Sequence, residues 1–215
     1  MKRIGKKHIK TCEQCGQPCK TRYCPSCRQV VRWKKRRKEL IQELFTARIE
    51  RDLHRYQIEV KEQDVLNLFQ KGQGVYLYGT PGTGKTLYAC SLLLEALKQD
   101  PTQKGLFIGM TSLLYQMRAS LQEQGGEIAL IDKYSTVPIL VLDDIGAAKA
   151  SEWVTQVTYS IINTRYESLM PTIITSNLGL DELSSQLKDD RISSRIIGMC
   201  AVRKFDTEDK RIGRK

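Results

Sequence analysis

The 215-residue sequence has no long apolar run. A membrane-spanning helix needs roughly 20 consecutive apolar residues, so we expect no membrane association. The basic N-terminus runs into Thr11, Cys12 and Glu13, where a secretory signal peptide would have its apolar segment. We therefore expect a cytoplasmic protein, in which cysteines stay reduced.

Acidic residues are scarce in the first quarter of the chain. Residues 1–48 contain 15 Lys and Arg but only Glu13, Glu39 and Glu43, a net charge of +12. Residues 49–215 contain 20 basic and 21 acidic residues, a net charge of −1. A basic block of this kind is typical of binding to nucleic acid or another anionic surface, and a solvated arm is the alternative.

The length of the chain allows one domain with a hydrophobic core and a small additional segment.

The N-terminal block is also rich in cysteine, since five of the seven cysteines lie between residues 12 and 27. Two CxxC pairs, Cys12 with Cys15 and Cys24 with Cys27, are separated by eight residues. Each pair can supply two thiolates, and two pairs close a tetrahedral zinc site. We predict a zinc-binding ribbon over residues 1–30, folded largely by the metal. Reduced free thiols or a redox pair are the alternatives.

The other three cysteines have separate interpretations. Cys19 could replace Cys15 or Cys24 as a ligand, but the symmetric pairs are the simpler choice. Cys90 and Cys200 lie in an expected helix and strand, and we expect them to be small core residues.

Glycine and proline are absent from Val30 to Tyr56. Apolar residues from Leu40 to Leu53 recur at spacings of three and four, which predicts an amphipathic helix with WKKRRK in its first turns. Residues 31–60 are therefore expected to form a basic helix and linker. Seven basic side chains are candidates for phosphate contacts, and two aromatic ones for base stacking: Arg22, Arg28, Arg32, Lys34, Lys35, Arg36 and Arg37, with Tyr23 and Trp33.

From residue 72 onwards, short apolar stretches alternate with helix-forming segments. The stretches lack polar alternation, which favours an α/β fold with a parallel sheet covered by helices on both faces. The expected strands are 75–79, 105–110, 137–146, 171–177 and 199–204. The expected helices are 61–70, 87–99, 112–123 and 152–168, followed by short helical pieces from residue 180.

One loop matches the phosphate-binding pattern GxxxxGK[ST] between an expected strand and helix. Its glycines allow backbone N–H groups to approach phosphate oxygens at a helix N-terminus, whereas a glycine-rich turn without ligand is the alternative. Lys85 is expected to reach the β and γ phosphates, and the Thr86 hydroxyl to bind magnesium. The candidate ATP-binding residues are Gly79, Thr80, Pro81, Gly82, Thr83, Gly84, Lys85 and Thr86.

Polar residues come directly after the apolar part of two expected strands, at the edge where open α/β sheets bind ligands. Asp143 is expected to hold magnesium together with Thr86, and Asp144 to polarise the attacking water. Asn177 could place its amide between the γ phosphate and that water. Asp pairs are also common at strand ends, and Asn after a strand is ordinary turn chemistry.

The segment RISSRI places Arg191 and Arg195 four residues apart, on one face of a helix. One interpretation is a pair of surface arginines bound to Asp189 and Asp190. The other is an arginine supplied to the nucleotide of a neighbouring subunit.

Together these motifs resemble the DnaC/IstB family of AAA+ ATPases over roughly residues 72–211. GTPGTGKT corresponds to Walker A, ILVLDDIG to Walker B, the run from NTRYE to TSNL to the sensor 1 region, and RISSRI to the arginine-finger box. The resemblance implies an AAA+ core over residues 61–215 without a helical lid, because the chain stops at Lys215. It implies that Asn177 is sensor 1, that Arg195 is the arginine finger with Arg191 beside it, and that Arg211, or failing that Lys210, is the sensor 2 residue.

The resemblance also implies a function, with three versions open. The first is an ATP-dependent loader of a replicative hexameric helicase, acting on single-stranded DNA as a ring or spiral homo-oligomer. The second is an IstB-type transposition ATPase that assembles on duplex DNA and contacts a transposase. The third is a DNA-binding adaptor that uses nucleotide as a switch and hydrolyses little. The expected cofactors are ATP, magnesium and zinc, and hydrolysis is expected to be slow and stimulated by partner or DNA.

Overall fold

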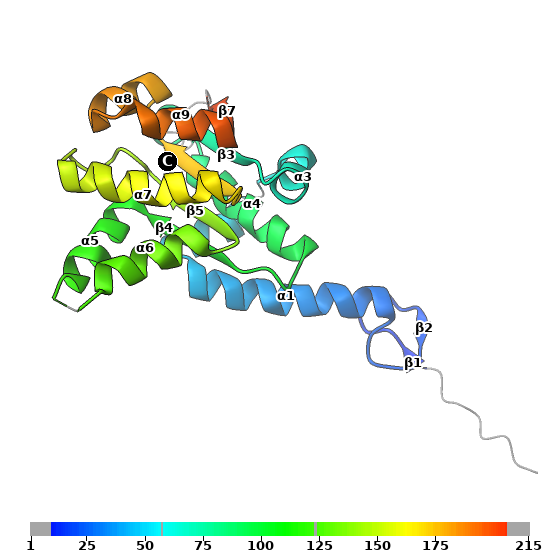
Figure 1. Cartoon of the computed structure of the whole chain (residues 1–215). Coiled ribbons are helices and arrows are strands. Elements are labelled where there is room, and N and C mark those ends of the chain that lie inside the picture. Colours follow the sequence, from blue (N-terminus) through cyan, green and yellow to red (C-terminus); the bar gives the residue numbers. More distant parts are fainter. Residues whose placement is uncertain (1–9, 57, 123, 206–215) are drawn as a thin grey trace, which may run out of the picture. The chain divides into compact units, whose positions relative to one another are not determined.

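The computed structural model describes residues 10–56, 58–122 and 124–205 (Figure 1). The chain divides into two compact units, Met1–Glu50 and Arg51–Lys215. Among the described residues, no helix is both long enough and apolar enough to cross a bilayer.

The first unit begins with a small antiparallel ribbon of β1 (Lys10–Thr11) and β2 (Pro18–Cys19). Gly16, with a φ of 72°, lies in the turn between them, where a left-handed backbone favours glycine. Helix α1 (Pro25–Leu44) follows, with proline in its first turn, where no backbone donor is lost.

The predicted helix from residue 30 to residue 56 is not continuous. It begins earlier, at Pro25, and α1 ends before Phe45, whose backbone is extended at φ −120° and ψ 148°. A second helix, α2 (Ala47–Arg55), starts where the Thr46 hydroxyl accepts a hydrogen bond from the Ile49 backbone N–H at 3.4 Å. A threonine at a helix start satisfies a backbone donor that the helix cannot, so a local cap overrides the apolar periodicity.

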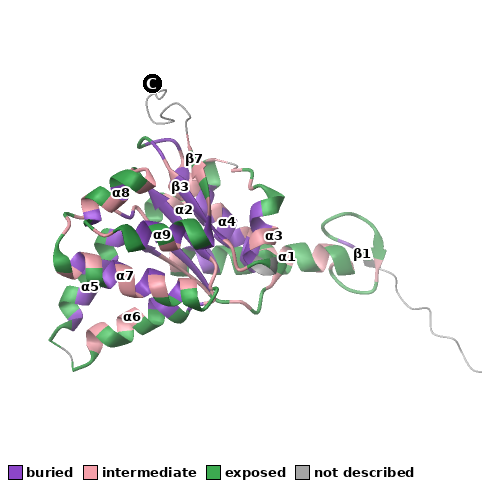
Figure 2. Ribbon diagram, turned by 45° about the horizontal axis from the view of Figure 1, so that its top comes forward, coloured by how far each residue is buried: buried purple, intermediate pink, exposed green. Residues whose placement is uncertain are grey.

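The second unit is built on a five-stranded sheet in the order β4-β5-β6-β3-β7, with all strands parallel. The strands are β3 (Gly74–Tyr78), β4 (Gly105–Gly109), β5 (Ile139–Asp143), β6 (Thr172–Ser176) and β7 (Cys200–Lys204). The central strands are buried on both faces, which explains their unbroken apolar sequence and confirms the predicted sheet (Figure 2).

Helices cover both faces of this sheet. They are α3 (Glu62–Gln70), α4 (Lys85–Gln99), α5 (Met110–Ser120), α6 (Gly126–Thr136), α7 (Glu152–Glu167), α8 (Leu180–Leu187) and α9 (Asp190–Met199). Helix α4 crosses from β3 to β4 and packs with α3 on one face; α7 and α9 pack together on the other (Figure 1). The chain runs from β3 to β4 at one edge of the sheet and then back through β5 and β6. Because crossovers between parallel strands are right-handed, the helix of the outward run and the helices of the return run lie on opposite faces.

Helix α6 is the element that the sequence did not predict. It starts after Gly125, which has a φ of 77° and serves as its N-cap, so the glycines at 125 and 126 mark a helix start and not a loop. Only Tyr134 and Ser135 of this helix are buried, which explains its weak apolar periodicity.

Arg165 is the largest fully buried side chain of the described residues. Its guanidinium donates to the backbone carbonyls of Tyr134, Ser135 and Val137 at 2.8–3.2 Å. It also donates to the Pro171 carbonyl and the Thr172 hydroxyl, both at 2.8 Å. One side chain of α7 thus joins the end of α6 to the start of β6, the strand that leads to the candidate site.

Candidate nucleotide site and N-terminal cysteine cluster

The loop between β3 and α4 has the backbone of a phosphate cradle. Gly79, Gly82 and Gly84 have φ values of 137°, 87° and 95°, in the region that residues with a Cβ rarely adopt. A Cβ at Gly79 would collide with the Phe205 carbonyl oxygen. The Lys85 ammonium lies within the loop and donates to the carbonyls of Gly79 and Thr80 at 2.7 and 2.8 Å. A loop shaped in this way presents its N–H groups to an anion at the start of α4.

Two predicted magnesium ligands lie in contact across the sheet edge. The Thr86 hydroxyl donates to Asp143 Oδ1 at 2.9 Å, although the two residues are 57 positions apart. Burial raises the pKa of Asp143 above its usual value, while hydrogen bonds from Thr175 and Thr86 oppose that shift. A carboxylate in such an environment is stabilised by a cation, so this pair of oxygens fits magnesium.

Thr175 is a site residue that the sequence analysis missed. Its hydroxyl donates to Asp143 Oδ1 at 2.6 Å and accepts from the Asp144 backbone N–H at 2.8 Å. The position directly before Ser176 and Asn177, at the end of an apolar strand, was the available clue. Thr175 fixes both aspartates relative to β6.

The predicted sensor residue also reaches the site. Asn177 Nδ2 donates to Asp144 Oδ1 at 3.0 Å. Asp144 has a φ of 58°, an uncommon backbone for a residue with a side chain, and its carboxylate is turned towards β6. The structure therefore brings together Lys85, Thr86, Asp143, Asp144 and Asn177 at one edge of the sheet.

A polar cluster behind the loop was not predicted. Arg203 on β7 forms an ion pair with buried Asp64 on α3, and Tyr88 on α4 donates to the same carboxylate. The Tyr88 ring packs edge-on against Phe205 at 5.4 Å, and the Phe205 backbone N–H donates to the Tyr78 carbonyl at 2.7 Å. Helices α3 and α4, which flank β3 in sequence, are thus joined to the distant strand β7, and the Phe205 hydrogen bond holds the end of β3 from which the phosphate loop starts.

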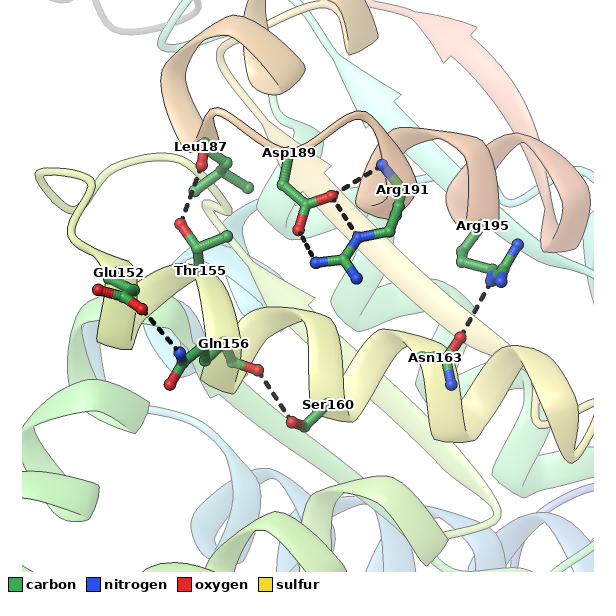
Figure 3. Close-up of polar contacts among 9 residues, drawn as sticks. All are labelled: Glu152, Thr155, Gln156, Ser160, Asn163, Leu187, Asp189, Arg191 and Arg195. Carbon is green, nitrogen blue, oxygen red and sulfur yellow. Dashed lines mark hydrogen bonds and ion pairs between the residues drawn. The ribbon is translucent and has the colours of Figure 1, made fainter.

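The two arginines of RISSRI project from α9 towards α7 (Figure 3). Arg191 binds Asp189 through Nε and Nη2 at 3.0 and 2.7 Å and lies over the Tyr159 ring. Arg195 donates from Nε to Asn163 Oδ1 at 3.0 Å and lies 4.8 Å from the Tyr166 ring centroid. The ion pair with Asp189 occurs as the surface interpretation expected, whereas Arg195 contacts an amide.

The four predicted zinc ligands form one cluster. The sulfur atoms of Cys12, Cys15, Cys24 and Cys27 all lie within 4.8 Å of one another. The Cys24 backbone N–H donates to Cys12 Sγ at 3.3 Å and lowers the pKa of that thiol to about 6. Hydrogen bonding with Cys24 and the other thiols raises the pKa of Cys27 to about 12. Because four adjacent thiols do not ionise together unaided, the donor set fits a divalent cation that prefers sulfur.

The remaining cysteines lie elsewhere. Cys19 Sγ donates to the Thr21 carbonyl at 2.7 Å and is outside the four-sulfur cluster. Cys90 and Cys200 are buried in the second unit, which confirms their prediction as core residues.

The basic side chains of the first unit differ in their surroundings. Arg22 binds Glu13 at 2.7 Å, and Arg28 donates to Thr21. The others are exposed along α1, where Trp33 is half-buried: Arg32, Lys34, Lys35, Arg36 and Arg37. Arg211 and Lys210, the sensor 2 candidates, lie outside the described residues.

Comparison with known proteins identifies relatives of two kinds. The replicative helicase loader DnaI of Bacillus subtilis (strain 168) is 28% identical over 180 residues, which cover 72% of this chain and 57% of DnaI. An ATP-binding protein of insertion sequence IS21 from Pseudomonas aeruginosa is 28% identical over 138 residues, which cover 64% of this chain and 51% of that protein. The chain thus spans little more than half the length of these curated relatives.

A solved structure supports the fold. The crystal structure of the DnaC helicase loader superposes with a TM-score of 0.62 at 25% identity, covering 74% of this chain and 99% of that one. This likeness and the strand order confirm the predicted AAA+ P-loop core. The family model described as IstB-like ATP binding protein matches residues 25–212. This chain therefore belongs to the IstB-like ATP-binding protein family.

Proposed function

We propose that this protein hydrolyses ATP and uses the cycle to load a replicative hexameric helicase onto DNA. The observation that supports hydrolysis best is the joined set of contacts from Thr86 to Asp143 to Thr175, and from Asp144 to Asn177. These contacts support the proposal because they join the proposed magnesium ligands, and the proposed water-activating residue with its neighbour, at one edge of the sheet. The loader role rests on the relatives named DnaI and DnaC.

In this proposal each residue at the sheet edge has a separate task. The loop Gly79–Thr86 binds the triphosphate through its N–H groups, with Lys85 moving from its own loop carbonyls to the β and γ phosphates. Thr86 and Asp143 hold magnesium, which offsets phosphate charge when bound. Asp144 orients and polarises the attacking water, and Asn177 fixes Asp144 in place.

Completion of the site is assigned to a neighbouring copy of the chain. Arg195 acts as the arginine finger of the adjacent subunit's site, with Arg191 beside it, in a ring or spiral homo-oligomer. Arg211 contacts the nucleotide of its own subunit. An arginine supplied in this way stabilises charge in the transition state and makes turnover depend on assembly.

The N-terminal unit is assigned to binding. Zinc on Cys12, Cys15, Cys24 and Cys27 would stabilise the ribbon predicted over residues 1–30, of which 1–9 lie outside the described residues. The basic segment 31–60 contacts single-stranded DNA or the helicase. Exposed cations along α1 suit a phosphate backbone, and Tyr23 and Trp33 suit stacking on bases.

The IS21 relative favours a second candidate, a transposition ATPase that assembles on duplex DNA. The core chemistry is common to both candidates, so the partner distinguishes them. A pull-down with a hexameric helicase and with a transposase, each with ATP, is the direct measurement. We expect retention of the helicase, and selective retention of the transposase would overturn the loader assignment.

The enzymatic part is tested through Arg195. We expect wild-type turnover to be slow alone and to rise with single-stranded DNA and helicase. Arg195→Ala should lose this stimulation, by about a hundredfold or more, while still binding a fluorescent ATP analogue. Arg118→Ala is the control, since Arg118 also lies over an aromatic ring, that of Trp153, at 5.3 Å. Turnover that stays low under all conditions would favour the nucleotide-switched adaptor.

A further inference from the structure

We propose that Asn163 and Glu167 on α7 are positioning residues for Arg195. This inference rests on the proposed function, in which Arg195 acts on the nucleotide of a neighbouring subunit. It adds that the geometry of this arginine is set inside its own subunit, by a two-residue relay on the adjacent helix (Figure 3).

Two contacts fix the Arg195 guanidinium. Its Nε donates to Asn163 Oδ1 at 3.0 Å, and its plane lies over the Tyr166 ring at 4.8 Å. The Tyr166 ring packs closely against Gly198 on the same helix as Arg195. There is no room for a side chain at position 198, since a Cβ there would lie 2.8 Å from a carbon of the ring. Because Asn163 takes only Nε, the two terminal nitrogens of Arg195 are left for another acceptor, and such a pair of donors suits phosphate oxygens.

Glu167 sets the orientation of the Asn163 amide. Asn163 Nδ2 donates to Glu167 Oε1 at 2.9 Å, one helical turn further along α7. A carboxylate only accepts hydrogen bonds, so the NH₂ group must face Glu167. The carbonyl oxygen of the amide is therefore left for Arg195, in the orientation that the guanidinium requires.

Arg195 differs from Arg191 in that its hydrogen-bond acceptor, the Asn163 amide oxygen, is uncharged. Arg191 binds the carboxylate of Asp189 with two nitrogens, so its positive charge is compensated within the subunit. Arg195 is held by an uncharged oxygen and a ring face, neither of which cancels its charge. The arrangement thus orients Arg195 and leaves its positive charge available to a phosphate.

The test uses ATP turnover of the full chain with single-stranded DNA and helicase, together with affinity for a fluorescent ATP analogue. Asn163→Leu has a similar volume but no acceptor, and we expect kcat to fall about tenfold or more at unchanged nucleotide affinity. Gln156→Leu is the matched control, since its amide donates to Glu152 on the same helix at 3.3 Å. We expect this control to turn over ATP within about twofold of wild type.

Reversal of the pair distinguishes positioning from packing. The double variant Asn163→Asp with Glu167→Gln keeps an acceptor for Arg195, a hydrogen bond between positions 163 and 167, and the same total charge. Its new carboxylate also compensates part of the charge of Arg195, so we expect it to recover some but not all of the turnover that Asn163→Leu loses. Turnover no higher than in Asn163→Leu would count against the relay.

Mixed oligomers distinguish a misplaced Arg195 from a folding defect of the Asn163→Leu subunit. Lys85→Ala subunits do not hydrolyse ATP but carry an intact Arg195, so adding them to Asn163→Leu subunits should restore turnover at the Asn163→Leu sites. Absence of that rescue, or wild-type turnover in Asn163→Leu when Arg195→Ala is inactive, overturns the inference alone. Wild-type turnover in Arg195→Ala overturns the proposed finger and the inference with it.

Discussion

Two charged side chains enclosed by the second unit are balanced in different ways. Asp143 accepts from two hydroxyl groups, and burial still raises its pKa, so a cation beside it would relieve the cost of its charge. Burial lowers the pKa of Arg165 to about 10, and its five hydrogen-bond acceptors are all neutral oxygens. Asp143 therefore suits binding of a cation, whereas Arg165 stabilises the packing of α6, α7 and β6.

Replacing Arg165 tests that structural role. In Arg165→Met, buried carbonyls lose their donors, each at a cost of about 1–3 kcal/mol, so we expect a loss of at least about 3 kcal/mol. For a chain of this size that loss lowers the Tm by about 6–12 °C. Thermal unfolding followed by circular dichroism measures it. Arg118→Met removes an exposed arginine and should shift the Tm by less than about 2 °C, and equal shifts in the two variants would contradict the assignment.

Among the secondary-structure elements, the two-stranded ribbon of β1 and β2 gains little stability from the burial of apolar side chains. Of the four clustered cysteines only Cys12 is buried, and β1 and β2 have two residues each. A segment of this size needs a metal or another cross-link for stability. The close sulfur positions fit a metal ion that would join the ribbon to the first turn of α1.

Zinc content distinguishes the cluster from the neighbouring thiol. We expect one zinc per chain in the wild type and in Cys19→Ser, because the Cys19 thiol donates to a carbonyl outside the cluster. Cys12→Ser should lose the metal, since three thiolates bind zinc far more weakly than four. Metal analysis by mass spectrometry after gel filtration gives the ratio. Loss of zinc in Cys19→Ser would mean that Cys19 is a ligand.

For the whole molecule, the charge is divided along the sequence. Residues 1–48 carry +12 and residues 49–215 carry −1. A nearly neutral core can pack against copies of itself without strong repulsion, while four thiolates on one zinc reduce the local positive charge by about two. The salt dependence of DNA binding should therefore arise in the first unit.

Neutralising α1 tests this division. Replacing Lys34, Lys35, Arg36 and Arg37 with Gln should reduce the slope of log affinity against log salt for single-stranded DNA by up to about 3, or 0.7 for each phosphate contact. Fluorescence anisotropy at several salt concentrations measures the slope. The control replaces four exposed lysines of the second unit, Lys98, Lys104, Lys133 and Lys149. If both sets change the slope equally, α1 is not the DNA-binding element.

Much of the fold was predictable because its determinants are local. The strands and α4, α5 and α7 were placed within a few residues, since apolar runs and helical periodicity are properties of short windows. The break near Phe45 was missed because the Thr46 cap competes with the periodicity, and α6 was missed because only two of its residues are buried, which leaves its apolar periodicity weak.

The phosphate-binding loop, the two aspartates at the end of β5 and the paired cysteines could be predicted from the sequence, because each of these motifs has a short fixed spacing. The contacts of Thr175 with Asp143, of Asn163 with Arg195 and of Arg203 with Asp64, 139 positions away, are known only from the folded chain. Such contacts depend on strand order and helix packing, which sum many weak interactions over the whole chain. No short window of sequence contains that information.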